Sequence, residues 1–368
     1  MGSSSPLFRP LVLPGLTLPN RIVMAPMTRE ASPGGVPGPD VADYYARRAA
    51  GGVGLIITEA TDIDHPASWG GRPGVPRFYG DDALAGWAHV VDAVHGAGGR
   101  IVPQLWHIGA ERAVAGDLDP GTLISPSGLA TTGERIGEPM TEAQIADVVA
   151  SFARAAAHAR RLGFDGVEIQ AGHGFLIDQF FWDGTNKRDD GYGGDFVQRT
   201  RFATEVVAAV RAATAPDFTV LMRLSQWKVA DFTARLVTGP EELDRFLAPL
   251  VTAGVDVFHC STRRYWQPEF EGSELNLAGW IKKLTGKPTM TVGNIGLADG
   301  DFMTTFYAER KGSLNAPVEP LEEMLERGEA DLAVVGRVLL ADSQWPEKIR
   351  TGSADLVPFR VEMAELLN

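Results

Sequence analysis

Eight short apolar segments along the 368 residues restrict the fold of this chain more than any other feature of the sequence. They cover residues 21–26, 53–60, 100–106, 164–170, 218–225, 255–261, 288–294 and 331–337. Each is mostly apolar on both alternating faces, which is typical of strands buried in a parallel sheet rather than of half-solvated antiparallel strands. These segments therefore predict eight buried parallel strands.

Segments with helical periodicity lie between these predicted strands. Residues 141–163 begin with the capping-box spacing of Thr141 and Gln144 and stop at a glycine. Similar patterns occupy 81–98, 195–214, 239–254 and 320–329. Repeated alternation of strand and helix predicts an α/β fold, a single (β/α)8 TIM barrel that spans residues 1–368 as one domain. A doubly wound open sheet is the alternative, but no G-x-G-x-x-G pattern follows an early strand.

Two further segments extend the minimal barrel. Residues 10–20, PLVLPGLTLPN, predict an N-terminal hairpin that caps the barrel floor. Residues 107–140, rich in Gly, Pro, Ser and Thr, predict a long loop after the third strand. Because barrel enzymes build their sites from loops at the C-terminal ends of strands, we expect the functional residues at that end.

Composition restricts the class of partner. The net charge of −13 and the absence of a long Lys/Arg block exclude nucleic acid and anionic membranes as favoured partners. No segment approaches the roughly 18 continuous apolar residues of a membrane helix, and the first residues, MGSSSPLFRP, lack the apolar stretch expected of a signal peptide. The single Cys260 precludes an internal disulfide, and no His/Cys/Asp spacing predicts a metal site. We expect a cytoplasmic monomer or homodimer that acts on a small molecule.

Polar residues at the ends of the predicted strands form the candidate site, because these ends converge on one barrel mouth. Thr28 and Gln104 offer hydrogen-bond donors and acceptors, and Arg223 places a cation where burial is costly without an electron-rich partner. The other strand ends carry Glu59–Ala60, Trp106–His107, Gln170 with His173, and Cys260–Ser261.

Two glycine-containing strand ends indicate a phosphate site. VGN places Gly293 and Asn294 after the seventh strand, and VGR places Gly336 and Arg337 after the eighth, where barrels commonly hold phosphate. Arg337 would add a charge-assisted contact. Plain glycine turns with a solvated arginine are the alternative. Together with Arg223, these residues describe a phosphorylated, planar, amide-like cofactor.

On these motifs the chain resembles the old yellow enzyme family of FMN-dependent ene-reductases. The matching segments are LPNRIVMAPMTR (18–29), GLIITEAT (54–61), QLWHIG (104–109), NKRDDGYGG (186–194) and the VGN and VGR ends. They occur in the family's order, almost from end to end. The resemblance implies a TIM barrel that binds FMN and uses NADPH or NADH as reductant.

The resemblance also implies which residues bind the cofactor. Thr28 would hydrogen-bond near C4=O and N5, Gln104 would pair with the pyrimidine edge, and Arg223 would lie by N1 and C2=O. Pro26, Met27 and Ala60 would line the isoalloxazine ring with Thr28, and Gly293, Asn294, Gly336 and Arg337 would hold the phosphate.

The segment VEIQAGHGF (167–175) departs from the family's pattern. The family has His-x-x-His or His-x-x-Asn followed by Gly-Tyr: the polar pair holds the substrate oxygen, and the tyrosine protonates the α-carbon after hydride reaches the β-carbon. Here Gln170 stands in place of the first His, His173 is retained, and Phe175 replaces the tyrosine. Gln170 and His173 can still donate hydrogen bonds, whereas Phe175 has no proton to deliver.

The sequence therefore predicts an FMN-dependent NAD(P)H oxidoreductase acting on CH–CH groups, with Gln170, His173 and Phe175 at the catalytic positions. It would reduce an enone-like alkene with atypical or specialised activity. The alternatives are a flavin-dependent isomerase, desaturase or aromatising enzyme, a flavin-binding protein with weak catalysis, and a flavin-free barrel aldolase or isomerase. Trp106, Tyr265 and Trp266 are expected to wall the substrate pocket, with Tyr265 as one substitute for the missing acid.

Overall fold

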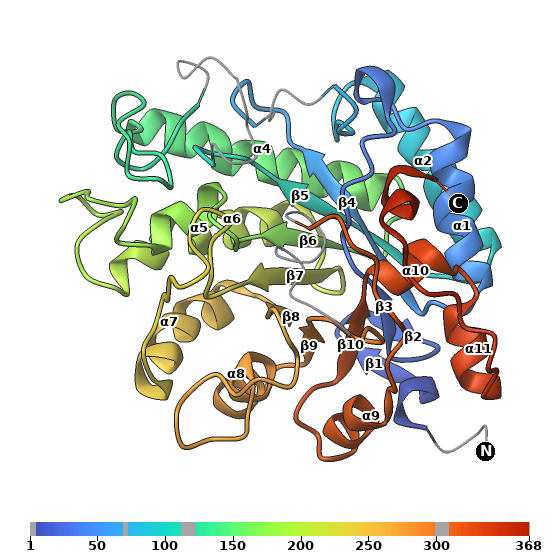
Figure 1. Ribbon diagram of the computed structural model, residues 1–368. Coiled ribbons are helices and arrows are strands. Elements are labelled where there is room, and N and C mark those ends of the chain that lie inside the picture. The colour runs from blue at the N-terminus through green and yellow to red at the C-terminus, as the bar shows by residue number, and fades with distance from the viewer. Residues whose placement is uncertain (1–4, 69–72, 112–122, 299–308, 368) are drawn as a thin grey trace.

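The computed structural model describes residues 5–68, 73–111, 123–298 and 309–367. Eight parallel strands close into a barrel in the order β10-β3-β4-β5-β6-β7-β8-β9 (Figure 1). They are β3 (Ile22–Met24), β4 (Leu55–Asp62), β5 (Ile101–Trp106), β6 (Gly166–Gln170), β7 (Thr219–Leu224), β8 (Val257–Ser261), β9 (Thr289–Val292) and β10 (Leu332–Val335). Each overlaps one predicted segment, which confirms the (β/α)8 barrel.

Helices cover the outside of the barrel (Figure 1). They are α1 (Pro39–Ala50), α2 (Asp81–Gly96), α4 (Glu142–Arg161), α5 (Leu176–Phe181), α6 (Arg201–Ala213), α7 (Pro240–Ala253), α8 (Leu277–Thr285), α9 (Glu319–Glu326), α10 (Arg337–Ala341) and α11 (Trp345–Thr351), with 3₁₀ turns at Pro6–Phe8, Pro33–Gly35, Gln198–Thr200 and Val361–Glu365. The capping box of α4 is present: Thr141 Oγ1 accepts from Gln144 N, and Gln144 Oε1 accepts from Thr141 N. None of the helices in the described part of the chain has the length and apolar character of a membrane span.

The predicted N-terminal hairpin is confirmed and closes one end of the barrel. Strands β1 (Leu11–Leu13) and β2 (Leu16–Leu18) pair antiparallel. Their leucines pack against inward-facing barrel residues such as Leu55 and Val102. Gly15 makes the turn with a φ of 74°, and a Cβ there would lie 1.7 Å from the carbonyl oxygen of Asp217. Glycine is therefore required both by the backbone conformation and by the close approach.

Alternation along the strands separates two environments. Residues such as Val102 and Val257 face the barrel interior, whereas Ile101 and Phe258 belong to the outer core beneath the helices. The interior positions nearest the C-terminal strand ends are polar instead of apolar. They are Gln104, Glu168, Gln170, Arg223, His259 and Ser261. The fold therefore places a polar layer at the barrel mouth, opposite the hairpin.

Candidate active site

Glu168 on β6 is the centre of the polar layer. Its Oε1 accepts from Gln104 Nε2 at 2.7 Å, and its Oε2 accepts from His259 Nδ1 at 2.7 Å. All three side chains are buried. Burial lowers the pKa of His259 although Glu168 opposes this, so the imidazole is neutral and its Nδ1 proton is committed to the carboxylate.

Arg223 on β7 stands beside this layer, in register with Gln170 and His259. Its buried Nε has no hydrogen-bond partner, and its guanidinium forms no ion pair, within the described residues. Burial lowers its pKa to about 10, and the charge of Glu168 opposes this, so the group stays cationic at neutral pH. A buried cation without a direct protein partner is costly and is expected to meet an electron-rich ligand.

Gln170 and His173 lie together at the end of β6, as predicted. Gln170 Nε2 is 3.1 Å from His173 Nδ1, and His173 Nε2 is 2.8 Å from Ser261 Oγ. The ring also stacks on Trp227, with centroids 4.3 Å apart. Burial first, and then the positive charges of Arg223 and Lys228, lower the pKa of His173 well below its usual value. His173 is therefore a neutral imidazole whose two nitrogens both contact protein side chains.

The backbone at His173 is held in the left-handed region, with φ of 66° followed by 87° at Gly174. His173 N donates to Ser225 Oγ at 2.7 Å, and Gly174 N donates to Asp178 Oδ2 at 2.7 Å. The other oxygen of Asp178 accepts from Lys228 Nζ at 2.8 Å, and both side chains of this ion pair are fully buried. The strained turn that carries His173 is therefore held by a hydrogen bond from Gly174 N to a buried ion pair.

Aromatic side chains form one wall of the mouth. Trp106 and Phe175 meet edge to face with centroids 5.4 Å apart, and both belong to a small cluster with Val75 and Ile108. The wall carries a phenyl ring at Phe175, where the resemblance in the motifs implies a tyrosine hydroxyl.

The segment after β3 carries Pro26, Met27 and Thr28. It is anchored by Glu59, whose Oε2 accepts from Arg29 N at 2.8 Å and from Glu30 N at 3.0 Å. Burial raises the pKa of Glu59 to about 7 despite these two hydrogen bonds. Thr28 is exposed and Ala60 is half-buried, so both are accessible from the mouth.

The two glycine-containing strand ends also come together, because β9 and β10 are neighbours. Arg337 Nη2 donates to Asn294 Oδ1, and Asn294 adopts a left-handed φ of 54° after Gly293 at 145°. Burial lowers the pKa of Arg337 to about 10, so this partly enclosed guanidinium keeps its charge. Gly293, Asn294, Gly336 and Arg337 thus form one cationic end of the mouth.

Other predicted residues lie further from these groups. Tyr265 is buried in the outer core cluster, and Trp266, which meets it edge to face, is 48% exposed. Their roles in a substrate pocket stay predictions. His107 hydrogen-bonds His65 Nδ1 and Gly109 N, in agreement with a structural role.

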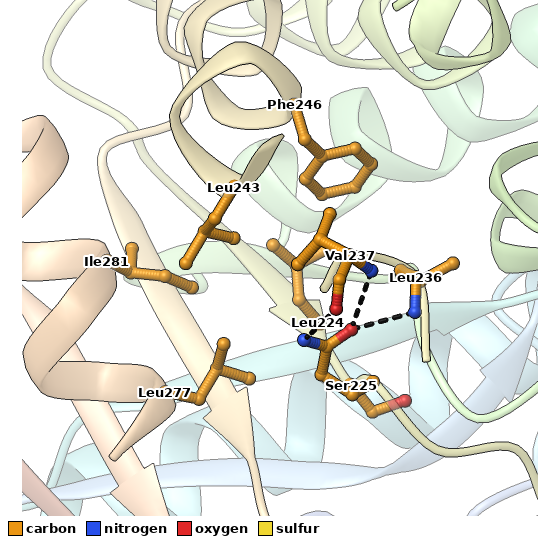
Figure 2. Close-up of a pocket in the computed structure, with 9 residues that line it drawn as sticks. Leu224, Ser225, Leu236, Val237, Leu243, Phe246, Leu277 and Ile281 are labelled. Atoms are coloured by element: carbon orange, nitrogen blue, oxygen red, sulfur yellow. Dashed lines mark hydrogen bonds between the residues drawn. The ribbon is translucent and has the colours of Figure 1, made fainter. Parts of the chain in front are cut away.

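Two cavities are lined by residues other than the polar groups of the mouth. One of about 10 Å³, behind β7, is lined by Leu224, Leu243, Phe246 and Ile281 (Figure 2). It has room for about one water and none for a cofactor. The other, of about 590 Å³, lies on the loop after β4 and includes Asp64 and Tyr79. We define the site by the polar groups at the mouth, because neither cavity contains them.

Comparison with known proteins identifies the relatives of the chain. The profile of the NADH:flavin oxidoreductase / NADH oxidase family matches residues 6–355. The flavin oxidoreductase hxnT of Emericella nidulans is 32% identical over 374 residues, which cover 96% of this chain and 93% of that protein. The chain spans about half the length of other curated relatives that it matches.

Solved structures give the same grouping. Morphinone reductase superposes with a TM-score of 0.78 at 30% identity, covering 98% of this chain and 93% of that one. The old yellow enzyme homologue of Zymomonas mobilis gives a TM-score of 0.76 at 27% identity, covering 98% and 96%. These likenesses agree with the fold and with the resemblance found in the motifs.

Proposed function

Because this chain belongs to the NADH:flavin oxidoreductase / NADH oxidase family, we propose that it is an FMN-dependent NAD(P)H oxidoreductase of the old yellow enzyme type, acting on an enone-like alkene. When bound, FMN supplies the hydride chemistry, accepting hydride from NAD(P)H and passing it to the substrate β-carbon.

The observation that carries this proposal is Arg223, which is half-buried in the mouth with its Nε enclosed and its guanidinium without a protein partner among the described residues. It would hold the electron-rich N1 and C2=O edge of the ring and stabilise negative charge there. Gln104 complements it. Its Nε2 is committed to Glu168, so its Oε1 is left to accept an N–H of the pyrimidine edge.

The remaining cofactor contacts follow the two ends of the mouth. Pro26, Met27, Thr28 and Ala60 would line the ring, with their segment anchored by Glu59. Gly293, Asn294, Gly336 and Arg337 would hold the phosphate, because two adjacent strand ends converge there on one guanidinium. The barrel order supports two sites at one mouth. Strand β10, which leads to the proposed phosphate site, pairs with β3, which leads to the proposed ring-lining segment.

Gln170 would bind the substrate oxygen, and His173 would join it only by exchanging its contact with Ser261 Oγ for the ligand. One N–H of the Gln170 amide is directed to His173 Nδ1, and its second N–H is available to a carbonyl oxygen. Gln170 has no charged form, and His173 is neutral, so stabilisation of a developing enolate is weaker than with a protonated imidazole. We therefore expect slow turnover of simple enones.

The test begins with the colour of the purified protein. We expect a yellow protein whose visible flavin absorption is bleached by NADPH or NADH without oxygen and restored slowly by cyclohexenone, with the saturated ketone as product. A protein that stays colourless and does not take up FMN would contradict the proposal. If NAD(P)H bleaches the flavin but no electron-poor alkene restores its colour, only the reduction of flavin by NAD(P)H would be supported, and the reduction of an alkene would be contradicted.

A flavin-dependent isomerase, desaturase or aromatising enzyme is the second candidate. Phe175 favours it, because the apolar wall with Trp106 offers no hydroxyl where the family delivers a proton. Incubation of the oxidised enzyme with unsaturated ketones, without NAD(P)H or oxygen, distinguishes the two. Isomerised or desaturated product supports this candidate, and unchanged substrate supports the reductase.

A further inference from the structure

Asp62 is a buried acid at the last position of β4, two residues after Ala60. Its side chain is fully buried, and neither carboxyl oxygen has a hydrogen-bond partner in the described ranges. Burial raises the pKa of this carboxyl well above its usual value, which favours the protonated form of the group. An unpaired buried carboxyl is costly, and proteins seldom keep one without a use.

A β-bulge directs Asp62 to the mouth. Ile57 pairs with Val102, but the next pair is Ala60 with Gln104, so β4 contains one extra residue. The shifted register pairs Asp62 with Trp106, and paired residues of neighbouring parallel strands project to the same face. Without the bulge, Thr61 would pair with Trp106 and Asp62 would point to the outer helices.

Asp62 therefore projects beside Trp106, one of the two rings of the apolar wall. Trp106, its partner in register, lies edge to face against Phe175 at 5.4 Å. The indole N–H of Trp106 also has no partner among the residues that the structure describes. This side of the mouth thus holds two unpaired polar groups between the cofactor-lining Ala60 and the substrate-binding turn.

The other polar groups of the mouth are committed to protein partners. His173 contacts Gln170 and Ser261 through its two nitrogens and is neutral. Glu168 accepts from Gln104 through one oxygen and from His259 through the other, so both of its oxygens act as acceptors. Neither group therefore offers a free proton to a ligand.

Two further acids face elsewhere. Tyr265 packs in the outer core cluster rather than in the barrel interior. Glu59 precedes Ala60 and is turned to the loop side, where its Oε2 accepts two backbone N–H groups. Of Tyr265, Glu59 and Asp62, Asp62 is the acid whose strand register turns it to the mouth and whose two carboxyl oxygens have no partner among the described residues.

We propose that Asp62 delivers the proton to the substrate α-carbon, the step for which Phe175 has no hydroxyl. This inference rests on the proposed function. The O–H bond of the Asp62 carboxyl breaks, and a C–H bond forms at the α-carbon with the electron pair of the enolate that hydride addition at the β-carbon leaves. Asp62 remains as a carboxylate and regains a proton from solvent before the next turnover.

The test compares Asp62→Asn with Asp64→Asn, the same change at an exposed aspartate two residues on. Each holoenzyme is reduced with NADPH without oxygen and mixed with cyclohexenone, and saturated ketone is measured by chemical quench. We expect D62N to form product ~10²–10⁴-fold more slowly, the usual contribution of a general acid, and D64N to match the parent. Adding Phe175→Tyr to D62N should restore the rate, because the tyrosine supplies the proton.

A readout independent of turnover uses infrared spectroscopy at neutral pH. The carboxylic-acid C=O band of Asp62 should be present in the parent protein and in D64N and absent from D62N. If D62N does not fold, the product rate of the single variant F175Y tests the proposal. Little change in that rate supports an acid already in place, and a gain of about 10²-fold overturns the proposal.

The outcomes separate the two proposals. Flavin that NADPH cannot bleach overturns the proposed function and this inference together. Normal bleaching with equal product rates in D62N and D64N overturns the role of Asp62 alone. A D62N variant that keeps its product rate but loses affinity for ligands with a basic nitrogen would make Asp62 a substrate anchor, which also overturns the proton role.

Discussion

The buried pair of Lys228 and Asp178 allows a quantitative test of how the His173 turn is held. Lys228→Met removes the ammonium that is 2.8 Å from Asp178 Oδ1 and leaves a carboxylate in a fully buried position. Removing one partner of a buried pair costs about 3–5 kcal/mol, because the remaining charge stays desolvated. A loss of that size is a large fraction of the usual ~5–15 kcal/mol stability of a folded domain.

The double variant Lys228→Met/Asp178→Asn separates charge from shape. The amide oxygen of the substituted side chain can still accept from Gly174 N, as Asp178 Oδ2 does now at 2.7 Å, and no unpaired charge remains. We therefore expect the double variant to recover most of the stability lost in K228M. Urea unfolding of the flavin-free proteins measures both changes.

The same two variants report on the site. K228M should also weaken binding of a carbonyl ligand, read from the perturbation of the flavin spectrum, whereas the double variant should bind nearly as the parent does. A K228M protein within about 1 kcal/mol of the parent in unfolding free energy would refute the reasoning, since the ion pair would then not be desolvated as the structure has it.

Three further predictions test the mouth. Arg223→Met should abolish tight FMN binding. It should leave the flavin-free protein as stable as the parent or more stable, because an unpaired cation is removed. Thermal unfolding with and without FMN measures both effects, and Arg223→Lys is the charge-conserving control. Gln170→Ala should lower kcat for enones by about 10²-fold, as for loss of an oxyanion donor, while NADPH reduces the flavin at the parent rate. Burial raises the pKa of Glu59 from 4.5 to about 7. Between these pH values the native state therefore binds more protons than the unfolded state, so the free energy of unfolding falls as the pH rises from 4.5 to 7. The fall is about 3 kcal/mol at most. Glu59→Gln should remove this part of the pH dependence in unfolding titrations, and an unchanged profile would refute the assignment.

The sequence alone was sufficient for the barrel and much of its mouth. Each of the eight strands forms a mostly apolar run, which is typical of strands buried in a parallel sheet, and the alternation with helical segments indicates a barrel. Gln104, Gln170 and Arg223 stand at strand ends, and all such ends of a closed parallel barrel converge on one opening. Helices α1, α5, α8, α10 and α11 were not predicted. Two of them show why. Helix α1 begins at Pro39 in a Gly/Pro-rich stretch, and α8 at an Asn276 cap.

Only the tertiary structure decided how the polar groups pair. Lys228 and Asp178 are 50 residues apart, and Glu168 and His259 are 91 apart, so no local pattern brings either pair together. The bulge in β4 is likewise set by pairing with β5, and it decides whether Asp62 faces the helices or the mouth. The pattern of apolar and polar residues along one segment predicts its secondary structure. The protonation and orientation of a buried group depend instead on which neighbours the closed barrel places around it.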